Sequence, residues 1–130
     1  MVSKVLVANR GEIACRILRA CKEAGLASVA IYAANDAKSL FVELADQAIV
    51  LEGDSITDTY LNQAQILEIA TTTGADALHP GFGFLSERAD FARAVSQAGI
   101  QWIGPSPNAI EKMGDKMSAR ITMRNAGVPV

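Results

Sequence analysis

Hydrophobic residues along this chain follow two periods that alternate. Short apolar runs rich in Val, Ile and Ala have the length and composition of buried strands, and Gly, Pro or Asn ends most of them. The predicted strands are 4–8, 28–32, 47–51, 76–79 and 101–103. Segments whose apolar residues recur every three or four positions lie between these runs and predict amphipathic helices. The predicted helices are 12–24, 40–45, 62–73, 88–98, a short helix from 107 to 113, and 115–126.

Local signals mark several helix ends. Asn62, followed three residues later by Gln65, resembles a capping box. Ser106 directly before Pro107 is a strong signal for a helix N-terminus. Gly25 is expected to stop the first helix.

The alternation of strands and helices predicts an α/β fold. We expect a doubly wound, mainly parallel sheet with helices on both faces. Ligands of such sheets bind at the carboxyl ends of the strands. The segment 79–87, HPGFGFLSE, follows the fourth predicted strand and is therefore expected at that edge.

Two interpretations of the segment HPGFGFLSE are open from its residues. Gly81 and Gly83 allow unusual backbone angles and a close approach of a partner. Ser86 is expected to cap a helix that begins near Glu87, and free amides at a helix start attract anions. The segment would then hold a small anion or form a pocket wall. The alternative is a glycine-rich turn that only reverses the chain, with His79 as a structural residue at a strand end.

The first predicted helix has an apolar face and a charged stripe. The apolar face comprises Ile13, Ile17, Leu18 and Cys21. The stripe on the opposite side comprises Glu12, Arg16, Arg19 and Glu23. Such a stripe is either a solvated, self-paired surface or a charged contact with a second subunit. Cys15 and Cys21 lie six positions apart and project from different faces, so we expect two free, buried thiols.

Met113-Gly114-Asp115-Lys116 is predicted to join two helices. Asp115 would cap the second helix, which would place Lys116 in its first turn. A helix dipole disfavours a cation at that position. Lys116 is therefore interpreted either as the partner of an anion such as a phosphate or as a solvated surface lysine.

Composition narrows the function classes. The chain has 130 residues, the size of one ordinary domain, and half of them are hydrophobic. The net charge of −2 gives no basic face for nucleic acid, and no apolar run has the length of a membrane span. Neither a GxGxxG dinucleotide fingerprint nor a P-loop is present. A single histidine and the absence of CxxC leave little material for a zinc site.

Four stretches occur together in one order. They are KVLVANRGEIA at 4–14, HPGFGFLSE at 79–87, IGPS at 103–106 and MGDK at 113–116. In this order and at this spacing they resemble the N-terminal domain of biotin carboxylase. The resemblance covers essentially the whole chain.

The resemblance implies a Rossmann-like pre-ATP-grasp domain over 1–114. Residues 115–130 would begin the linker to an ATP-grasp region, and the chain would be an inactive piece of a longer enzyme. The family uses MgATP to activate bicarbonate as carboxyphosphate, and the carboxyl group then moves to biotin on a carrier protein. The catalytic residues and the Mg²⁺ ligands are expected outside these 130 residues.

The resemblance also implies roles for individual residues. Lys116 matches the family lysine that contacts the nucleotide phosphates. The loop that walls the bicarbonate and biotin end is matched by His79, Gly81, Phe82, Gly83 and Glu87. Positions at the family's dimer interface are matched by Arg16, Arg19 and Glu23. Many members have tyrosine where this chain has Phe82, so this chain keeps the ring and lacks the hydroxyl at that position.

The partners implied are a biotin carboxyl carrier protein or domain, a carboxyltransferase component and a second copy of the chain, in the cytoplasm. No nucleic-acid or membrane partner is expected. Two alternatives remain. One is a stand-alone, non-catalytic binding or dimerisation module. The other is another pre-ATP-grasp ligase, such as a carbamoyl-phosphate or purine-pathway enzyme.

Overall fold

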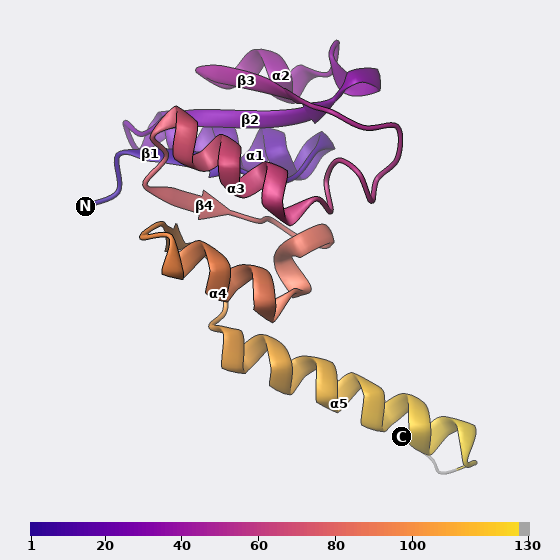
Figure 1. The fold of residues 1–130 in the computed structure, drawn as a ribbon. Coiled ribbons are helices and arrows are strands. Elements are labelled where there is room, and N and C mark those ends of the chain that lie inside the picture. The colour runs from indigo at the N-terminus through magenta and orange to yellow at the C-terminus, as the bar shows by residue number, and fades with distance from the viewer. Residues whose placement is uncertain (128–130) are drawn as a thin grey trace.

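The computed structural model describes residues 1–127, apart from the side chains of Thr122 and Asn125. Five strands in this part of the chain form one parallel sheet in the order β3-β2-β1-β4-β5 (Figure 1). The strands are β1 (Lys4–Val7), β2 (Ala27–Ala33), β3 (Gln47–Leu51), β4 (Ala77–His79) and β5 (Gln101–Trp102). The helices are α1 (Gly11–Glu23), α2 (Leu40–Leu44), α3 (Gln63–Thr73), α4 (Ala89–Gln97) and α5 (Pro107–Asn125). Two short 3-10 turns, η1 (Ala34–Asp36) and η2 (Phe84–Glu87), follow β2 and β4.

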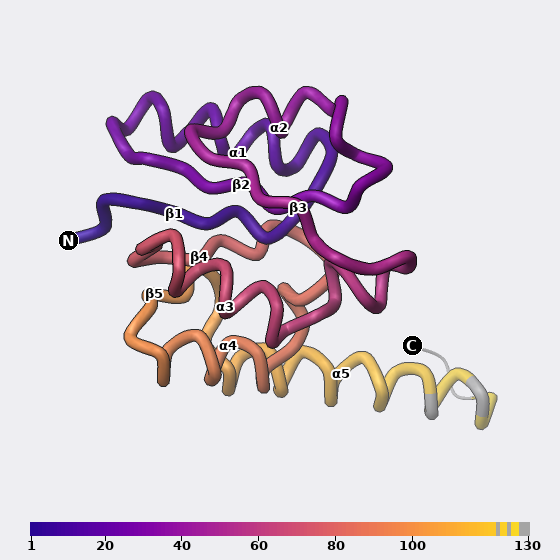
Figure 2. Tube along the Cα trace, turned by 45° about the horizontal axis from the view of Figure 1, so that its top comes forward, coloured from indigo at the N-terminus to yellow at the C-terminus, as the bar shows by residue number. Residues whose placement is uncertain are grey.

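The sheet separates two hydrophobic layers, because successive side chains of a strand point to opposite faces. Val5 and Val7 of β1 pack with Leu18 of α1 and Phe41 of α2. Leu6 between them packs on the other face with residues of α3 and α4, such as Ile66 and Phe91. Figure 2 shows α1 and α2 on one side of the strands and α3 and α4 on the other. The predicted doubly wound α/β fold is confirmed.

The order in which strands are added to the sheet switches side at β1. The strand after β1 lies on one side of it and β4 lies on the other. The loops that follow β1 and β4 therefore start side by side, and the Ala8 amide donates to the His79 carbonyl at 2.9 Å. Ligands of doubly wound sheets bind at such a switch point. The segment HPGFGFLSE lies there, as expected.

Several local predictions are confirmed. The Asn62 side chain accepts a hydrogen bond from the Gln65 amide at 3.0 Å. The Ser106 hydroxyl accepts one from the Ala109 amide at 3.1 Å. Cys15 and Cys21 are buried and free. Apart from the break predicted inside α5, the element ends differ from the predicted ones by at most one residue, within the usual uncertainty of helix and strand ends.

The predicted cap of α4 is wrong. Ser86 lies inside the turn η2, where its amide donates to the Gly83 carbonyl at 3.0 Å. Helix α4 begins at Ala89 after Arg88, without a side-chain cap. Leu85 is fully buried and fixes this extra turn in the core before the helix can start. The helix start that was expected near Glu87 therefore lies at Ala89, after η2.

The predicted break at Gly114 is also wrong. A single helix, α5, runs from Pro107 through Gly114 to Asn125. An interior glycine costs a helix only about 1 kcal/mol relative to alanine, which does not end a helix with residues of good propensity on both sides. Asp115 is therefore no cap, and Lys116 lies within the helix instead of its first turn. The helix dipole therefore does not disfavour a cation at Lys116.

Ile13 departs from the predicted apolar face of α1. Leu18 and Cys21 are buried as predicted and Ile17 is half-buried, but Ile13 is exposed at the edge of the helix. Its side chain faces Gly81, so it belongs to the surface around the loop after β4.

None of the helices in the described part of the chain is long and apolar enough to cross a bilayer.

Candidate functional site

The loop after β4 is shaped by His79 and the glycines that follow it. The Gly81 amide donates to Nδ1 of His79 at 3.0 Å. This bond requires an unprotonated Nδ1, so the neutral ring carries its hydrogen on Nε2. Burial lowers the pKa of His79 below its usual value, which favours this neutral form. His79 therefore stabilises the turn by accepting this hydrogen bond.

Backbone angles in this loop belong to regions that few residues adopt. Gly81 has φ of 68° and Gly83 has φ of 72° with ψ of −164°. Phe84 has φ of 49°, the single positive value for a non-glycine residue in the described part of the chain. For a non-glycine residue such as Phe84 this conformation costs about 1–3 kcal/mol and persists where the surrounding structure enforces it, whereas glycine adopts a positive φ without this penalty. The loop is therefore a tight turn whose backbone the surrounding structure holds, and its role as an anion site or pocket wall stays a prediction.

Phe82 stands out from the loop and divides two hollows. Its side chain is 76% exposed, the most exposed of the aromatic residues with described side chains. One hollow, of about 540 Å³, lies toward α1 and is lined by Ile13, Arg16 and His79 as well as Phe82. The other, of about 470 Å³, lies toward α5 and is lined by Met113 and Met117 as well as Phe82. A large exposed ring between two apolar hollows is typical of a binding surface.

The structure brings most of the predicted site residues to this surface. His79, Gly81 and Phe82 line the first hollow together with Arg16. Gly81, Phe82 and Glu87 line the second. Gly83 follows Phe82 in the loop, directly before the turn η2.

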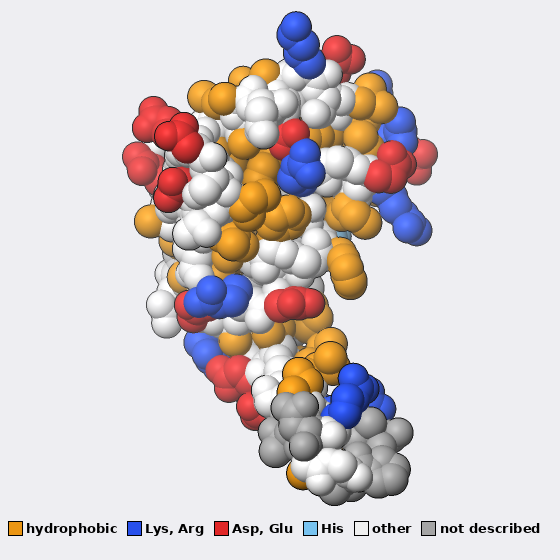
Figure 3. Space-filling model, turned by 90° about the vertical axis from the view of Figure 1, so that its right-hand side faces the viewer, with side chains coloured by type: hydrophobic (Ala, Val, Ile, Leu, Met, Phe, Trp, Pro, Cys, Tyr) orange, Lys and Arg blue, Asp and Glu red, His pale blue; other side chains and the backbone are white. Residues whose placement is uncertain are grey.

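Lys116, Arg19 and Glu23 lie apart from these hollows. Lys116 is exposed on α5, next to Met117. Arg19 and Glu23 are exposed on α1, and the Arg19 guanidinium lies 4.0 Å from the Glu12 carboxylate. This distance is at the limit of an ion pair, so the stripe is mostly solvated in a single chain. Figure 3 shows the C-terminal part of the chain projecting from the body of the molecule, with hydrophobic and basic side chains on it.

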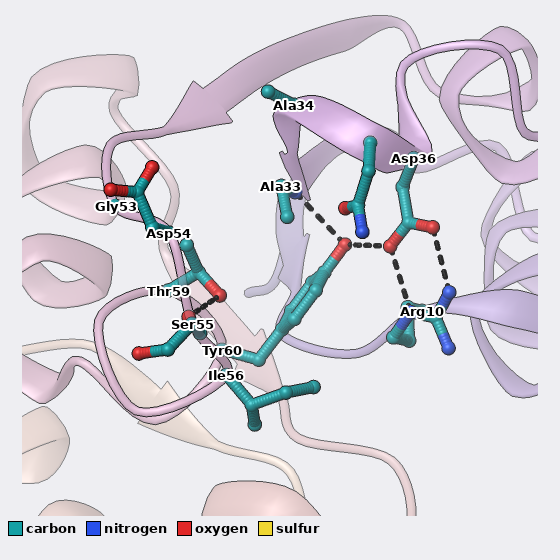
Figure 4. Close-up of a pocket in the computed structure, with 11 residues that line it drawn as sticks. Arg10, Ala33, Ala34, Asp36, Gly53, Asp54, Ser55, Ile56, Thr59 and Tyr60 are labelled. Atoms are coloured by element: carbon teal, nitrogen blue, oxygen red, sulfur yellow. Dashed lines mark hydrogen bonds and ion pairs between the residues drawn. The ribbon is translucent and has the colours of Figure 1, made fainter.

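A polar network missed by the sequence analysis lies at the same edge of the sheet (Figure 4). Arg10, after β1, donates from Nε and Nη2 to both carboxylate oxygens of Asp36, at 2.7 and 2.6 Å. The Tyr60 hydroxyl donates to Asp36 Oδ2 at 2.6 Å and accepts from the Ala33 amide at 3.0 Å. These residues line a third hollow of about 550 Å³. The network ties together the chain segments that follow β1, β2 and β3.

Hydrogen bonds and burial shift the pKa values of Arg10, Asp36 and Tyr60. Hydrogen bonds from Arg10 hold the pKa of Asp36 below its usual range, although burial opposes them. The same pair raises the pKa of Arg10. Burial, helped by the hydrogen bond to Asp36, raises the pKa of Tyr60 to about 12. Asp36 is thus ionised and Tyr60 neutral across the physiological range.

Asn9 is the other residue that the sequence analysis missed. It is 3% exposed and its amide lies against the loop after β4. The only sequence signal was its place directly after an apolar run, at the carboxyl end of a strand. No group of three or more potential metal-ligating side chains occurs among the residues that the structure describes.

The fold and this edge define a class of protein: a doubly wound α/β domain whose binding surface is built by the loops at the switch point. Within that class, residues 1–110 match the family model "Biotin carboxylase, N-terminal domain". This chain belongs to the biotin carboxylase family, in which it corresponds to the N-terminal domain. The match removes the alternative of a carbamoyl-phosphate or purine-pathway ligase.

Named relatives agree with this membership. Biotin carboxylase 1 of Bacillus subtilis is 49% identical over 130 residues, which are 100% of this chain and 29% of that protein. The acyl-coenzyme A carboxylase alpha3 subunit of Mycobacterium leprae is 52% identical over 129 residues, 99% of this chain and 22% of that subunit. The chain thus spans less than a third of the length of these relatives.

A solved structure shows the same fold. It is the biotin carboxylase domain dimer of 2-oxoglutarate carboxylase from Hydrogenobacter thermophilus, in complex with MgADP, ADP and bicarbonate. The TM-score is 0.85 at 50% identity, covering 100% of this chain and 28% of that one.

Proposed function

We propose that this chain is the N-terminal portion of a biotin carboxylase, which uses MgATP and bicarbonate to carboxylate biotin on a carrier protein. The observation that carries the proposal is the Phe82 ring, held outward between two hollows at the switch point of the sheet. In the proposed enzyme the loop with His79, Gly81, Phe82, Gly83 and Glu87 is one wall of the bicarbonate and biotin pocket. The reacting groups and the Mg²⁺ ligands belong to the remainder of the enzyme.

The chain's own residues would act through shape and exclusion of water. An exposed phenyl ring offers a flat apolar surface to a ligand and keeps water from it. Neutral His79 keeps the turn in place without adding a charge near an anion. Lys116 would approach the nucleotide phosphates as a flexible point charge on α5. ATP would supply the phosphoryl group that activates bicarbonate.

A chimera tests the proposal. This chain replaces the matching 130 residues of the Bacillus subtilis relative, and ATP-dependent carboxylation of free biotin is measured. We expect carboxylation that requires both ATP and bicarbonate. A folded chimera without it, judged by circular dichroism, contradicts the proposal.

Two lysines on α5 provide a matched pair for the nucleotide role. Lys116→Ala in the chimera is expected to raise KM for ATP at least about 10-fold, because a direct charge contact to phosphate is lost. Lys112→Ala removes an equally exposed lysine from the same helix and is expected to leave KM for ATP within about 2-fold. Equal effects of the two substitutions contradict a phosphate contact by Lys116.

We also propose that two copies associate through the face of α1 that carries Arg16, Arg19 and Glu23. Exposed Ile13 and half-buried Ile17 beside Arg16 give this face an apolar centre with a charged rim. Arg19→Glu is expected to shift sedimentation toward the monomer, whereas Lys38→Glu, the same charge change at an exposed site off this face, is not. Association without any carboxylation by the chimera would instead favour a stand-alone dimerisation module.

The remaining partners follow from the proposed reaction. They are a biotin carboxyl carrier protein or domain and a carboxyltransferase component. A reducing cytoplasm suits the buried free thiols Cys15 and Cys21. The boundary between the pre-ATP-grasp domain and the following region is proposed at residue 114, inside α5.

A further inference from the structure

Asn9 uses all of its hydrogen-bonding side-chain atoms on two loops. Its Nδ2 donates to the carbonyls of Pro80 and Phe82, both at 2.8 Å. Its Oδ1 accepts from the Arg10 amide at 2.8 Å. The amide thus joins the loop after β1 to the loop after β4, at positions 71 and 73 residues further along the chain.

Gly81 allows this close contact. A Cβ atom at Gly81 would lie 2.7 Å from Asn9 Nδ2 and 2.9 Å from Ile13 Cγ2. The two carbonyls that Asn9 holds are those on either side of Gly81 in the chain. Asn9 therefore holds the peptide group that precedes Gly81 and the peptide group that follows Phe82.

The loop needs such a grip because its backbone is strained. Phe84, two residues after Phe82, is a non-glycine residue with a positive φ, while Gly83 before it adopts a positive φ without strain. On the far side, the rings of Tyr60 and Phe84 pack with their centroids 5.5 Å apart. The segment is thus held on both sides of Gly83, and Phe82 itself has no comparable packing because its ring is exposed.

We propose that Asn9 is a positioning residue for Phe82, and that it holds the loop so that the ring keeps its place between the two hollows. This inference rests on the proposed function, in which Phe82 forms part of the biotin and bicarbonate wall. Only a short side chain that carries two donor hydrogens on one nitrogen can reach both carbonyls. A carboxylate at this position would face two carbonyl oxygens without a hydrogen to donate, and a serine hydroxyl has one hydrogen.

A double-mutant cycle in the chimera tests the link between the two residues. Asn9→Ala is expected to lower kcat/KM for free biotin about 10- to 100-fold, mainly through KM for biotin, with KM for ATP unchanged within about 2-fold. In a Phe82→Ala background the same substitution is expected to add little, because the ring that Asn9 positions is gone. Losses that multiply in the double variant, or a loss in KM for ATP alone, overturn the inference.

Asn62→Ala is the matched control. It removes an asparagine whose side chain caps α3, away from the loop after β4, and so lowers stability without touching Phe82. We expect its kcat/KM for biotin to stay within about 2-fold of the unsubstituted chimera. Asn9→Ser is a milder variant for the case in which Asn9→Ala does not fold.

A spectroscopic readout on the chain itself separates this inference from the proposed function. With 4-fluorophenylalanine at the four Phe positions, the ¹⁹F signal of Phe82 is identified by its absence in Phe82→Leu. It is expected to shift or broaden in Asn9→Ala and in Asn9→Ser, and to stay in place in Asn62→Ala. An unchanged Phe82 signal overturns the inference whether or not the chimera is active. An inactive unsubstituted chimera overturns the proposed function alone.

Discussion

The guanidinium of Arg10 meets the carboxylate of Asp36 at two points, Nε to Oδ2 at 2.7 Å and Nη2 to Oδ1 at 2.6 Å. The Asp36 side chain is 8% exposed, whereas the Arg10 side chain is 43% exposed. The pair therefore joins the interior of the protein to its surface at the edge where the switch-point loops meet. Its consequences for stability can be measured.

Asp36→Asn is expected to destabilise the protein by about 2 kcal/mol at pH 7, at the lower end of the range for hydrogen bonds to charged groups because water screens half-exposed Arg10. Arg10 lowers the pKa of Asp36 in the folded state. The pair therefore stabilises the fold above the unfolded-state pKa of about 3.9, and this stability is lost as the pH falls through the folded-state pKa. Urea unfolding of both proteins should show a difference that shrinks below about pH 4.

The control for this substitution is Asp54→Asn, at an exposed carboxylate in the same hollow. A surface change of this kind is expected to alter the free energy of unfolding by less than about 0.5 kcal/mol. An Asp36→Asn deficit of the same size at pH 2.5 and pH 7 would show that the ion pair is not its cause.

Tyr60→Phe is expected to lower the free energy of unfolding at pH 7 by about 1–2 kcal/mol, because the Ala33 amide and the Asp36 carboxylate each lose a partner. The pKa of Tyr60 is raised to about 12 in the folded protein. The neutral hydroxyl therefore contributes its full stability below about pH 10, and this contribution is lost as the pH rises through about 12. Denaturant unfolding from pH 7 to 11.5 should show the wild type approaching Tyr60→Phe. A gap that stays constant, or one that Tyr32→Phe reproduces, would contradict this account.

Gly81→Ala is expected to destabilise the protein by about 2–5 kcal/mol. The substitution combines the cost of a left-handed backbone with a Cβ pressed onto Asn9 and Ile13. Gly25→Ala is the matched control, because its φ of 74° is similar and open space surrounds it. Its cost should be only about 1 kcal/mol. Chemical denaturation of the two variants compares the values directly, and equal costs would mean that the contact with Asn9 is not tight.

Removal of residues 113–130 is expected to change the free energy of unfolding by less than about 0.5 kcal/mol. The described side chains of α5 from Glu111 onward are exposed, while Ile110 is buried and Glu111 pairs with Arg93 of α4. Ile110→Ala in the same chain should cost about 2–3 kcal/mol, since a buried side chain is truncated. Thermal and urea unfolding distinguish the two. A loss above 1 kcal/mol on truncation would show that the distal half of α5 is packed in the isolated chain.

The order of strands and helices could be predicted from sequence because it depends on near neighbours. Val5 and Leu6 differ by one position and therefore face opposite layers of the sheet. Asn62 and Ser106 cap their helices through contacts only three residues long. The motif at 79–87 was placed at the correct edge by its position after an apolar run. The roles of Lys116, Phe82 and the charged stripe of α1 stay predictions.

The contacts that shape the site depend on the arrangement of the sheet. Arg10 and Asp36 lie 26 residues apart in sequence, and Asn9 lies more than 70 residues from the loop it holds. No local period connects them, and the strand order that places β1 between β2 and β4 brings them together. The cap of α4 and the passage of α5 through Gly114 also escaped prediction. Burial of Leu85 places a 3-10 turn before α4, and one glycine does not end a helix that has good helix formers on both sides. The sequence by itself determined the elements and their faces, through interactions a few residues long. The tertiary structure decided which loops touch and which polar groups are buried together, because parallel strands bring distant segments to one edge.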